Sequence, residues 1–304
     1  DLRAVIAAEV EARQAGDAEA LQALLDPAAG PQWVERQHNI LQLPITAIDV
    51  QRLFGSGDLA LAAVIETQAQ TDAQPLTYYT YRVLRHTPDG WKLTAPTLQA
   101  WGEPITMTVG TITQTYRAFD APYVQAIAPR LEAAVDQMVA DFGLGDAAPP
   151  AWHITVEPVF PGDPPYSPQN PSDVKIASPV TLFFSVAQAA TPEAFLLGLT
   201  VDNLGHALLH YAYGAVATEP GRLALGHTAV QWEVEQAVGV DNTARLRVAA
   251  GPAAPGQGPT PLTTLLNPTQ FSAEGRAYED RNLFLRFLVE RYGRSVLGPY
   301  LAAV

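Results

Sequence analysis

The chain has 304 residues, of which 48% are apolar, so it is long enough to form two domains with sizeable cores. Acidic residues outnumber basic ones by 31 to 18, and the formal net charge is −13. This balance argues against partners that are bound through phosphates, so we expect neither nucleic acid nor an anionic lipid surface. The absence of cysteine excludes disulfides, thiolate metal sites and cysteine nucleophiles.

The first hundred residues change their hydrophobic period once. Apolar residues recur at helical spacing over residues 2–26, with a break at Gly16-Asp17, and Trp33 lies on a further short turn. Alternating and β-rich patterns then predict strands at 45–50, 59–70, 76–85 and 91–93. We therefore expect helices followed by four strands in meander order.

Two short motifs support a family resemblance for this part. Residues 12–21 read ARQAGDAEAL and residues 89–93 read DGWKL. A broken helix followed by a meander that ends in this step resembles the SnoaL-like, nuclear transport factor 2-like fold. The resemblance implies a cone-like sheet over residues 1–99, and it says little about function.

The tyrosines of this predicted domain have two interpretations. Tyr78, Tyr79 and Tyr81 are strand residues first, and the alternative is that they line a pocket for a small apolar ligand. Asp49 and Glu66 could imitate the acid and base of isomerase relatives, although their spacing does not demand it.

A second unit is expected over residues 100–304, and the boundary follows from the period change and from Trp101-Gly102. Residues 105–116 read as a strand, and Asp120 opens a predicted helix to residue 142. A proline-rich loop over 149–179 contains strands at 153–159 and 174–176. Further helices are predicted at 192–213, after the start signal Thr191-Pro192, and at 222–238 and 276–292. The fold class is therefore α+β, with two domains.

Two of these helices are apolar but carry one polar stripe each. Asp202, His206 and His210 recur every four residues on the first helix, and His227, Gln231 and Glu235 do so on the second. Two neighbouring stripes of this kind indicate a shared polar site. We therefore expect Asp202 or His206 to lie near Glu235.

The same helices resemble a known family. Residues 200–210, TVDNLGHALLH, resemble the zinc helix of gluzincin (thermolysin-like, MA-clan) metallopeptidases. Residues 232–238, WEVEQAV, resemble the segment that supplies the third zinc ligand, and residues 281–293 resemble the closing helix of that family. Shorter matches lie at 119–122 and 177–179. The resemblance covers residues 100–304 and implies a mostly helical gluzincin-like domain with a small sheet.

Not all of the catalytic residues of that family are present. The resemblance places Asp202 at the first histidine ligand, Asn203 at the general base, His206 at the second histidine and Glu235 at the third ligand. An asparagine cannot accept the proton of a zinc-bound water. The other register keeps His206 and His210 but puts an alanine at the base. We therefore expect no catalytic residue, no bound zinc or other metal, and no other cofactor.

Three interpretations of function remain open. The first is a catalytically inactive metallopeptidase homologue, a pseudoenzyme that acts as a binding or scaffold module for an unidentified protein or small molecule. The second is a divergent metal-dependent hydrolase that uses His206, His210 and Glu235. The third is binding of a small apolar ligand by the N-terminal domain. The purely structural alternative for Asp202 and His206 is a buried ion pair or hydrogen bond that remains from a lost metal site.

The apolar stretch 194–217 raises the question of a membrane span. Its ionisable and amide residues favour a buried helix, so we expect no membrane contact within these residues. The sequence starts at Asp1 rather than Met, so we expect a trimmed or processed form, with any membrane anchor outside these residues. We also expect an extracytoplasmic protein or one that is anchored to a membrane through a preceding segment. The arginines of the last part are expected on a solvated helix face: Arg281, Arg286, Arg291 and Arg294.

Overall fold

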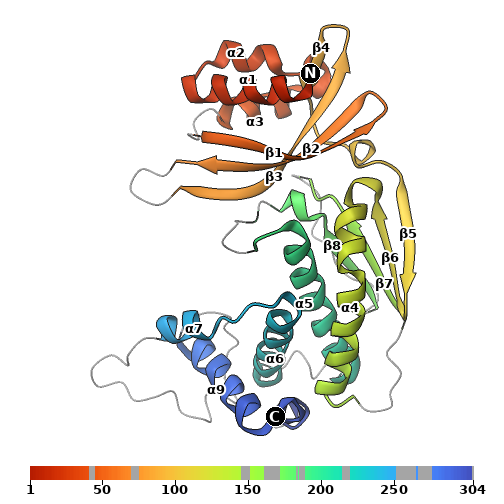
Figure 1. Cartoon of the computed structure of the whole chain (residues 1–304), viewed down its shortest axis with the longest axis vertical. Coiled ribbons are helices and arrows are strands. Elements are labelled where there is room, and N and C mark those ends of the chain that lie inside the picture. Colours follow the sequence, from red (N-terminus) through yellow and green to blue (C-terminus); the bar gives the residue numbers. More distant parts are fainter. Residues whose placement is uncertain are drawn as a thin grey trace.

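The computed structural model describes residues 1–40, 45–69, 75–144, 151–160, 172–182, 184, 189–213, 220–250, 265 and 276–302. These residues form an α+β fold with two separate four-stranded sheets, as the sequence predicts (Figure 1). No described helix combines the length and apolar character needed to cross a bilayer.

The N-terminal part consists of helices followed by an antiparallel meander with the order β1-β2-β3-β4. Its elements are α1 (Leu2–Ala15), α2 (Ala18–Leu24), α3 (Pro31–Ile40), β1 (Ile45–Ser56), β2 (Leu59–Gln68), β3 (Leu76–Thr87) and β4 (Gly90–Leu93). The predicted break at Gly16 is confirmed, because this glycine ends α1 in the left-handed region with φ 64°. The segment around Trp33 is a helix rather than a short turn.

Successive residues of β2 face opposite sides of the first sheet, and both sides are covered. Ala60, Ala62 and Val64 pack with Ile6 of α1, whereas Leu61 belongs to the core of the second unit. Figure 1 shows α1, α2 and α3 on one face of this sheet and the rest of the chain on the other. The N-terminal sheet is therefore buried from both sides.

The second unit begins with a sheet in the order β5-β6-β7-β8 and continues as packed helices. Its elements are β5 (Pro104–Val109), β6 (Ile112–Arg117), α4 (Ala121–Asp141), β7 (Trp152–Glu157), β8 (Asp173–Ala177), α5 (Pro192–Tyr213), α6 (Pro220–Val238), α7 (Thr243–Ala250), α9 (Arg276–Tyr292) and α10 (Leu297–Leu301). Short 3-10 turns lie at Pro27–Ala29, Leu98–Trp101, Ala118–Asp120, Pro179–Thr181 and Arg294–Val296. The single strand predicted over 105–116 is a hairpin, because Gly110 turns the chain with φ 55°. Residues 149–150 and 161–171 of the proline-rich loop lie outside the described residues.

The residue that is expected to open the helix caps α5 but does not cap α4. The Thr191 hydroxyl accepts a hydrogen bond from the Ala194 backbone N–H at 3.2 Å, as an N-cap does. Asp120 makes no such cap with α4. Its buried carboxylate instead accepts a hydrogen bond from the Ser178 hydroxyl at 2.7 Å. The two short matches at 119–122 and 177–179 therefore meet in space.

Helices α5 and α6 run antiparallel and approach closely at glycines. A Cβ on Gly205 would lie 2.8 Å from Val230 Cγ2, and one on Gly226 would lie 2.7 Å from Leu209 Cδ1. Side chains from the partner helix thus fill the space that these residues leave. This contact fixes the register in which the two polar stripes face each other.

One hydrophobic core joins the N-terminal sheet to the second unit. Leu59, Leu61 and Val83 of the first sheet share it with Trp101 and with the helices that follow. The two sheets are separate, but a fragment starting near residue 100 would expose Trp101, which is fully buried in the whole chain. The division into domains 1–99 and 100–304 stays a prediction.

Candidate functional site

The two polar stripes meet across the α5–α6 contact. The Gln231 amide donates a hydrogen bond to Asp202 Oδ1 at 2.7 Å. One turn away, Nε2 of His206 lies 3.4 Å from Nδ1 of His227. The carboxylate of Asp202 lies 3.9 Å from His206 Nε2. Asp202 and His206 of α5 therefore each have a contact on α6.

The two imidazoles are held as a neutral pair. Their ring centroids lie 5.5 Å apart, with the planes inclined by 21°. Burial lowers the pKa of His206, and burial together with the neighbouring His206 ring lowers that of His227. Burial raises the pKa of Asp202, although His227 and Gln231 act in the opposite direction. Such a pair can form one hydrogen bond between its rings and carries little charge at neutral pH.

Glu235 takes its hydrogen bonds from a different set of residues. The Asn242 amide donates to Glu235 Oε1 at 3.0 Å, and the Arg286 guanidinium of α9 donates to Oε2. Glu235 and Arg286 are both buried. Among the described residues, no hydrogen bond or ion pair joins Glu235 to Asp202 or His206.

The other two residues of the predicted site, Asn203 and His210, lie in different surroundings. The Asn203 amide donates to the Leu199 carbonyl of its own helix at 2.8 Å. The side chain of His210 is exposed. Within the part of the chain that the structure describes, no group of three or more histidine, aspartate or glutamate side chains is arranged to hold a metal ion. Among the described residues, Glu235 and Asn203 thus have hydrogen-bond partners within the chain itself.

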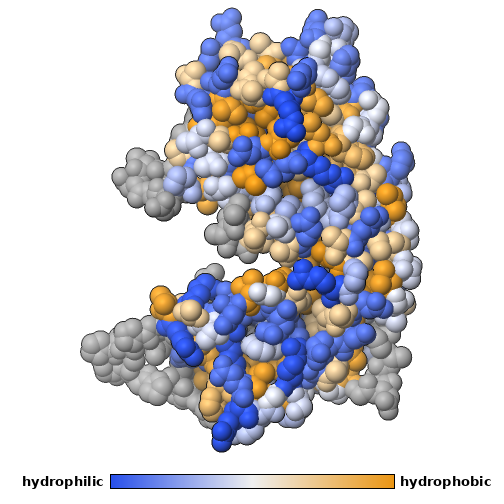
Figure 2. All heavy atoms as spheres, viewed as in Figure 1, coloured by the Kyte–Doolittle hydropathy of each residue, from blue (hydrophilic) through white to orange (hydrophobic). Residues whose placement is uncertain are grey.

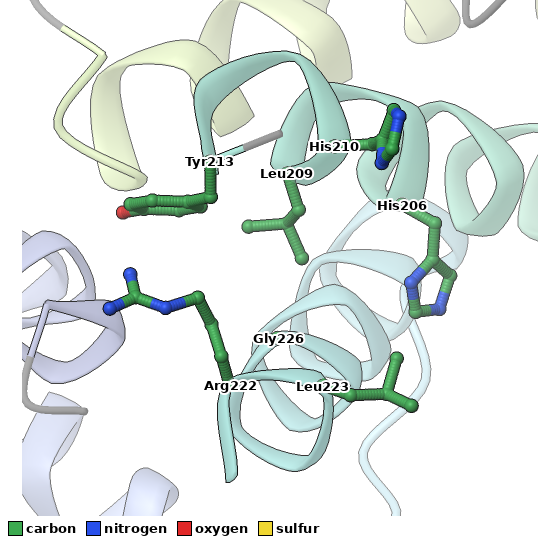
Figure 3. A pocket seen from close by; sticks show the side chains of 7 residues that line it. All are labelled: His206, Leu209, His210, Tyr213, Arg222, Leu223 and Gly226. Carbon is green, nitrogen blue, oxygen red and sulfur yellow. The ribbon is translucent and has the colours of Figure 1, made fainter. Parts of the chain in front are cut away.

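A pocket opens beside the imidazole pair, at the end of α5 and the start of α6. Its volume is about 180 Å³. Seven residues line it: His206, Leu209, His210, Tyr213, Arg222, Leu223 and Gly226. Figure 3 shows Tyr213 and the Arg222 guanidinium together at one end and His206 at the other. This is a small cavity with apolar walls and a few polar groups, as ligand sites commonly are.

The interior of the N-terminal part holds a ring of alternating charges. Arg13 binds Glu66 at 3.0 Å and Glu9 at 3.3 Å, while Arg82 binds Glu9 at 2.8 Å and Glu66 at 2.6 Å. Burial would raise the pKa of Glu66, but the two arginines lower it to about 2. A carboxylate held in this way is a poor general base.

The three candidate pocket tyrosines do not share a face. The Tyr78 hydroxyl donates to Glu66 at 3.0 Å, inside the charged ring. Tyr79 and Tyr81 lie on the opposite side of the sheet, where Tyr79 stacks on Phe184 and Tyr81 meets the edge of Trp101. The period of two along a strand separates them. They therefore do not line one pocket together.

Several arginines differ from the expectation of a solvated face. Arg281 is 1% exposed and Arg286 is 5% exposed, while Arg294 binds Asp141 and the buried Glu233. Only Arg291 among the four lies exposed. Sequence reasoning missed Arg286 as the partner of Glu235, and also Arg222 in the pocket. The available signal was Glu235 itself, because a buried carboxylate requires a cation from some neighbouring element.

Three comparisons with known proteins found no match for this chain. No family model, no curated protein and no solved structure matches this chain.

Proposed function

We propose that this protein is a catalytically inactive relative of the gluzincin metallopeptidases and acts as a binding or scaffold module. The proposal includes the SnoaL-like first domain, a protein or small molecule as partner, and an extracytoplasmic or membrane-anchored location. The observation that carries it is the ion pair between Glu235 and Arg286.

The pair matters because a guanidinium supplies the positive charge that a metal ion would bring to this carboxylate. Arginine keeps its proton at all accessible pH values, so its positive charge stays beside Glu235 and competes with a metal ion. The Asn242 amide occupies the second oxygen of Glu235. Both oxygens of the family's third ligand are thus engaged with groups from the chain itself.

The other motif positions support the same conclusion. The Asn203 amide cannot accept a proton from water. It donates a hydrogen bond to the backbone of its own helix. Asp202 and His206 find their partners on α6, which satisfies polar groups on two otherwise apolar helices. These residues stabilise the helix contact without requiring a bound ion.

The test combines zinc titration with peptide hydrolysis. We expect the wild-type chain to bind no stoichiometric zinc in calorimetry and to show no casein hydrolysis that a chelator abolishes. Hydrolysis that is lost both with chelator and in Glu235→Ala would overturn the proposal, and so would stoichiometric zinc bound through Glu235.

A restored site provides a second measurement. The variant Asp202→His/Asn203→Glu should gain less zinc affinity than the same variant with Arg286→Met added, because Arg286 competes for Glu235. Adding Arg291→Met instead is the matched control, since Arg291 is exposed on the same helix. Equal zinc affinity with and without Arg286 would contradict the role assigned to the ion pair.

A further inference from the structure

We propose that the outer edge of β5 pairs antiparallel with β5 of a second copy of this chain, so that the two four-stranded sheets become one sheet across a two-fold axis. The feature that carries the proposal is an open edge strand, Pro104–Val109, whose side chains match those of their own copy on both faces of the sheet. The inference concerns assembly, so it goes beyond the proposed binding function and does not depend on it.

The outer edge of β5 is accessible. This strand comes first in the order β5-β6-β7-β8 of the described second sheet, so β6 pairs with its inner edge only. Thr106 and Thr108 are exposed. Figure 1 shows β5 at the right-hand margin of the molecule, and Figure 2 shows hydrophobic and near-neutral residues along this margin. An edge of this kind presents backbone N–H and C=O groups to which another strand can bond.

The hairpin with β6 decides which backbone groups point outward. Val109 and Ile112 flank its two-residue turn, and the pair that flanks such a turn exchanges hydrogen bonds. At the far end of the same register, the Glu103 carbonyl accepts a hydrogen bond from the Ala118 N–H at 2.9 Å. Both contacts involve odd-numbered residues of this segment. The odd-numbered residues of β5 therefore bond to β6, and the even-numbered ones turn their N–H and C=O groups away from it.

Thr106 and Thr108 are thus the residues whose backbone can bond to a second copy. Their hydroxyls lie 3.2 Å from those of Thr115 and Thr113, respectively, which is the close side-chain approach of non-hydrogen-bonded pairs. Pro104 has no N–H. If Thr106 lies opposite Thr108 of the second copy, both outward N–H groups of each copy find a carbonyl. This register forms four backbone hydrogen bonds, two donated by each copy.

The side chains match in the same register. Met107 faces Met107 of the second copy, and Ile105 faces Val109 of the second copy. All three residues are half-buried, and Ile105 and Met107 pack against the core, so the pairing covers apolar surface. On the other face, Thr106 lies beside Thr108 of the second copy, and the threonine pairs with β6 continue across the axis as rows of hydroxyls. Identical strands thus complement each other on both faces, as a two-fold interface requires.

The charge of the strand favours a second copy as the partner. The segment from residue 104 to 110 reads PITMTVG and contains no ionisable side chain. Proteins commonly protect an edge strand from pairing by placing lysine or other charged residues on it. Here two copies meet without like charges directly opposite each other, although each copy carries a net charge of −13. A contact made by strands of 6 residues is small, so we expect a weak dimer rather than an obligate one.

Cysteine cross-linking tests the register. The chain contains no cysteine, so one introduced thiol reports a single contact between copies. Met107→Cys should form a disulfide-linked dimer under mild oxidation, because directly opposite residues have Cα atoms about 4.5–5.5 Å apart. Thr106→Cys alone should cross-link far less, because its two copies lie diagonally, about 7–8 Å apart. Thr106→Cys mixed with Thr108→Cys should favour the mixed disulfide over either homodimer.

Sedimentation equilibrium measures the dimer without a cross-link. We expect the wild type to dimerise reversibly with a dissociation constant on the order of 0.1 mM. Thr106→Glu/Thr108→Glu should raise that constant at least about tenfold, because it places two pairs of carboxylates directly opposite each other. His153→Glu/Thr155→Glu is the matched control, since it adds the same charge at the same spacing on the same sheet face, but on the interior strand β7. It should change the constant by less than about twofold.

Three results would overturn the inference. One is a chain that stays monomeric at concentrations up to about 1 mM. The second is equal cross-linking by Met107→Cys and Thr106→Cys. The third is a dimer that the glutamates on β5 weaken no more than those on β7 do, since its interface then lies elsewhere. None of these results bears on the proposed lack of peptidase activity, which the zinc and casein measurements test independently.

Discussion

Arg286 of α9 donates a hydrogen bond to the carboxylate of Glu235 on α6, and both side chains are buried. The guanidinium also lies 3.3 Å from the Thr243 hydroxyl and above the Trp232 ring. One cation thereby connects α6, the start of α7 and α9. The ion pair both neutralises the buried carboxylate of Glu235 and connects the last helices.

The first prediction follows from this pair. Arg286→Met should lower the free energy of unfolding by about 3–5 kcal/mol, because it leaves a buried carboxylate without its cation. Urea denaturation measures this loss. Arg291→Met on the same helix should change stability by less than about 0.5 kcal/mol, as an exposed substitution does. A loss below about 1 kcal/mol for Arg286→Met would mean that another group or water stabilises the charge of Glu235 in the variant.

The second prediction concerns pH and Glu233. Burial, together with the neighbouring Asp141, raises the pKa of Glu233 from 4.5 to about 8, despite the ion pair with Arg294. The folded state therefore holds this proton over a range in which the unfolded state has lost it. Stability contributed by this group is complete below pH 4.5 and is lost as pH rises towards 8. The slope is at most about 1.4 kcal/mol per pH unit.

Urea midpoints measured from pH 5 to 9 check this dependence. Glu233→Gln should flatten the fall, since an amide does not titrate. Asp120 contributes with the same sign, because burial raises its pKa from 3.8 to about 7, so Asp120→Asn should remove a second part of the slope. Stability that rises from pH 5 to 8 in the wild type would contradict both assignments.

The third prediction has the opposite sign and concerns Glu66. Its pKa of about 2 in the folded state, against 4.5 ordinarily, means that its stabilisation is present above pH 4.5 and is lost as pH falls towards 2. Glu66→Gln should therefore reduce the acid sensitivity of the N-terminal part. It should also lower stability at pH 7 by about 3–5 kcal/mol, because Arg13 and Arg82 lose a shared partner.

Circular dichroism during acid titration distinguishes this variant from its control. Glu11 lies on the same helix as Glu9 but is exposed. The control variant Glu11→Gln should therefore leave the acid midpoint nearly unchanged. Identical acid midpoints for Glu66→Gln and the wild type would show that the charged ring does not govern acid unfolding.

The fourth prediction tests the close approach of α5 and α6. Gly205→Ala should destabilise the chain by about 1–3 kcal/mol, because its Cβ would overlap Val230. Gly198→Ala is the matched control on the same helix. There the nearest atom to a new Cβ is Val238 Cγ1 at 3.4 Å, so the gain in helix propensity, up to about 1 kcal/mol, should prevail.

Thermal denaturation of both glycine variants gives the comparison directly. Val230→Ala should rescue part of the loss in Gly205→Ala, because it removes the methyl groups that collide with the new Cβ. Equal effects of the two glycine substitutions would mean that the helices separate easily at this contact.

The sequence by itself determined the elements whose signals are local. The left-handed glycine at Gly16, the hydroxyl cap at Thr191 and the apolar period of α5 each act within a few residues, and the structure has the corresponding helix ends and the helix. The stripes on α5 and α6 were also visible, because a helix brings every fourth residue to one face.

Only the tertiary structure decided which groups pair. Whether Glu235 meets His206 or Arg286 depends on how α9 packs on α6, and no spacing within either helix specifies that contact. The same holds for Asp120, which pairs with Ser178 across the second unit rather than capping its own helix. A buried charge must find an opposite charge or a donor, but which one is set by the packing of the whole core.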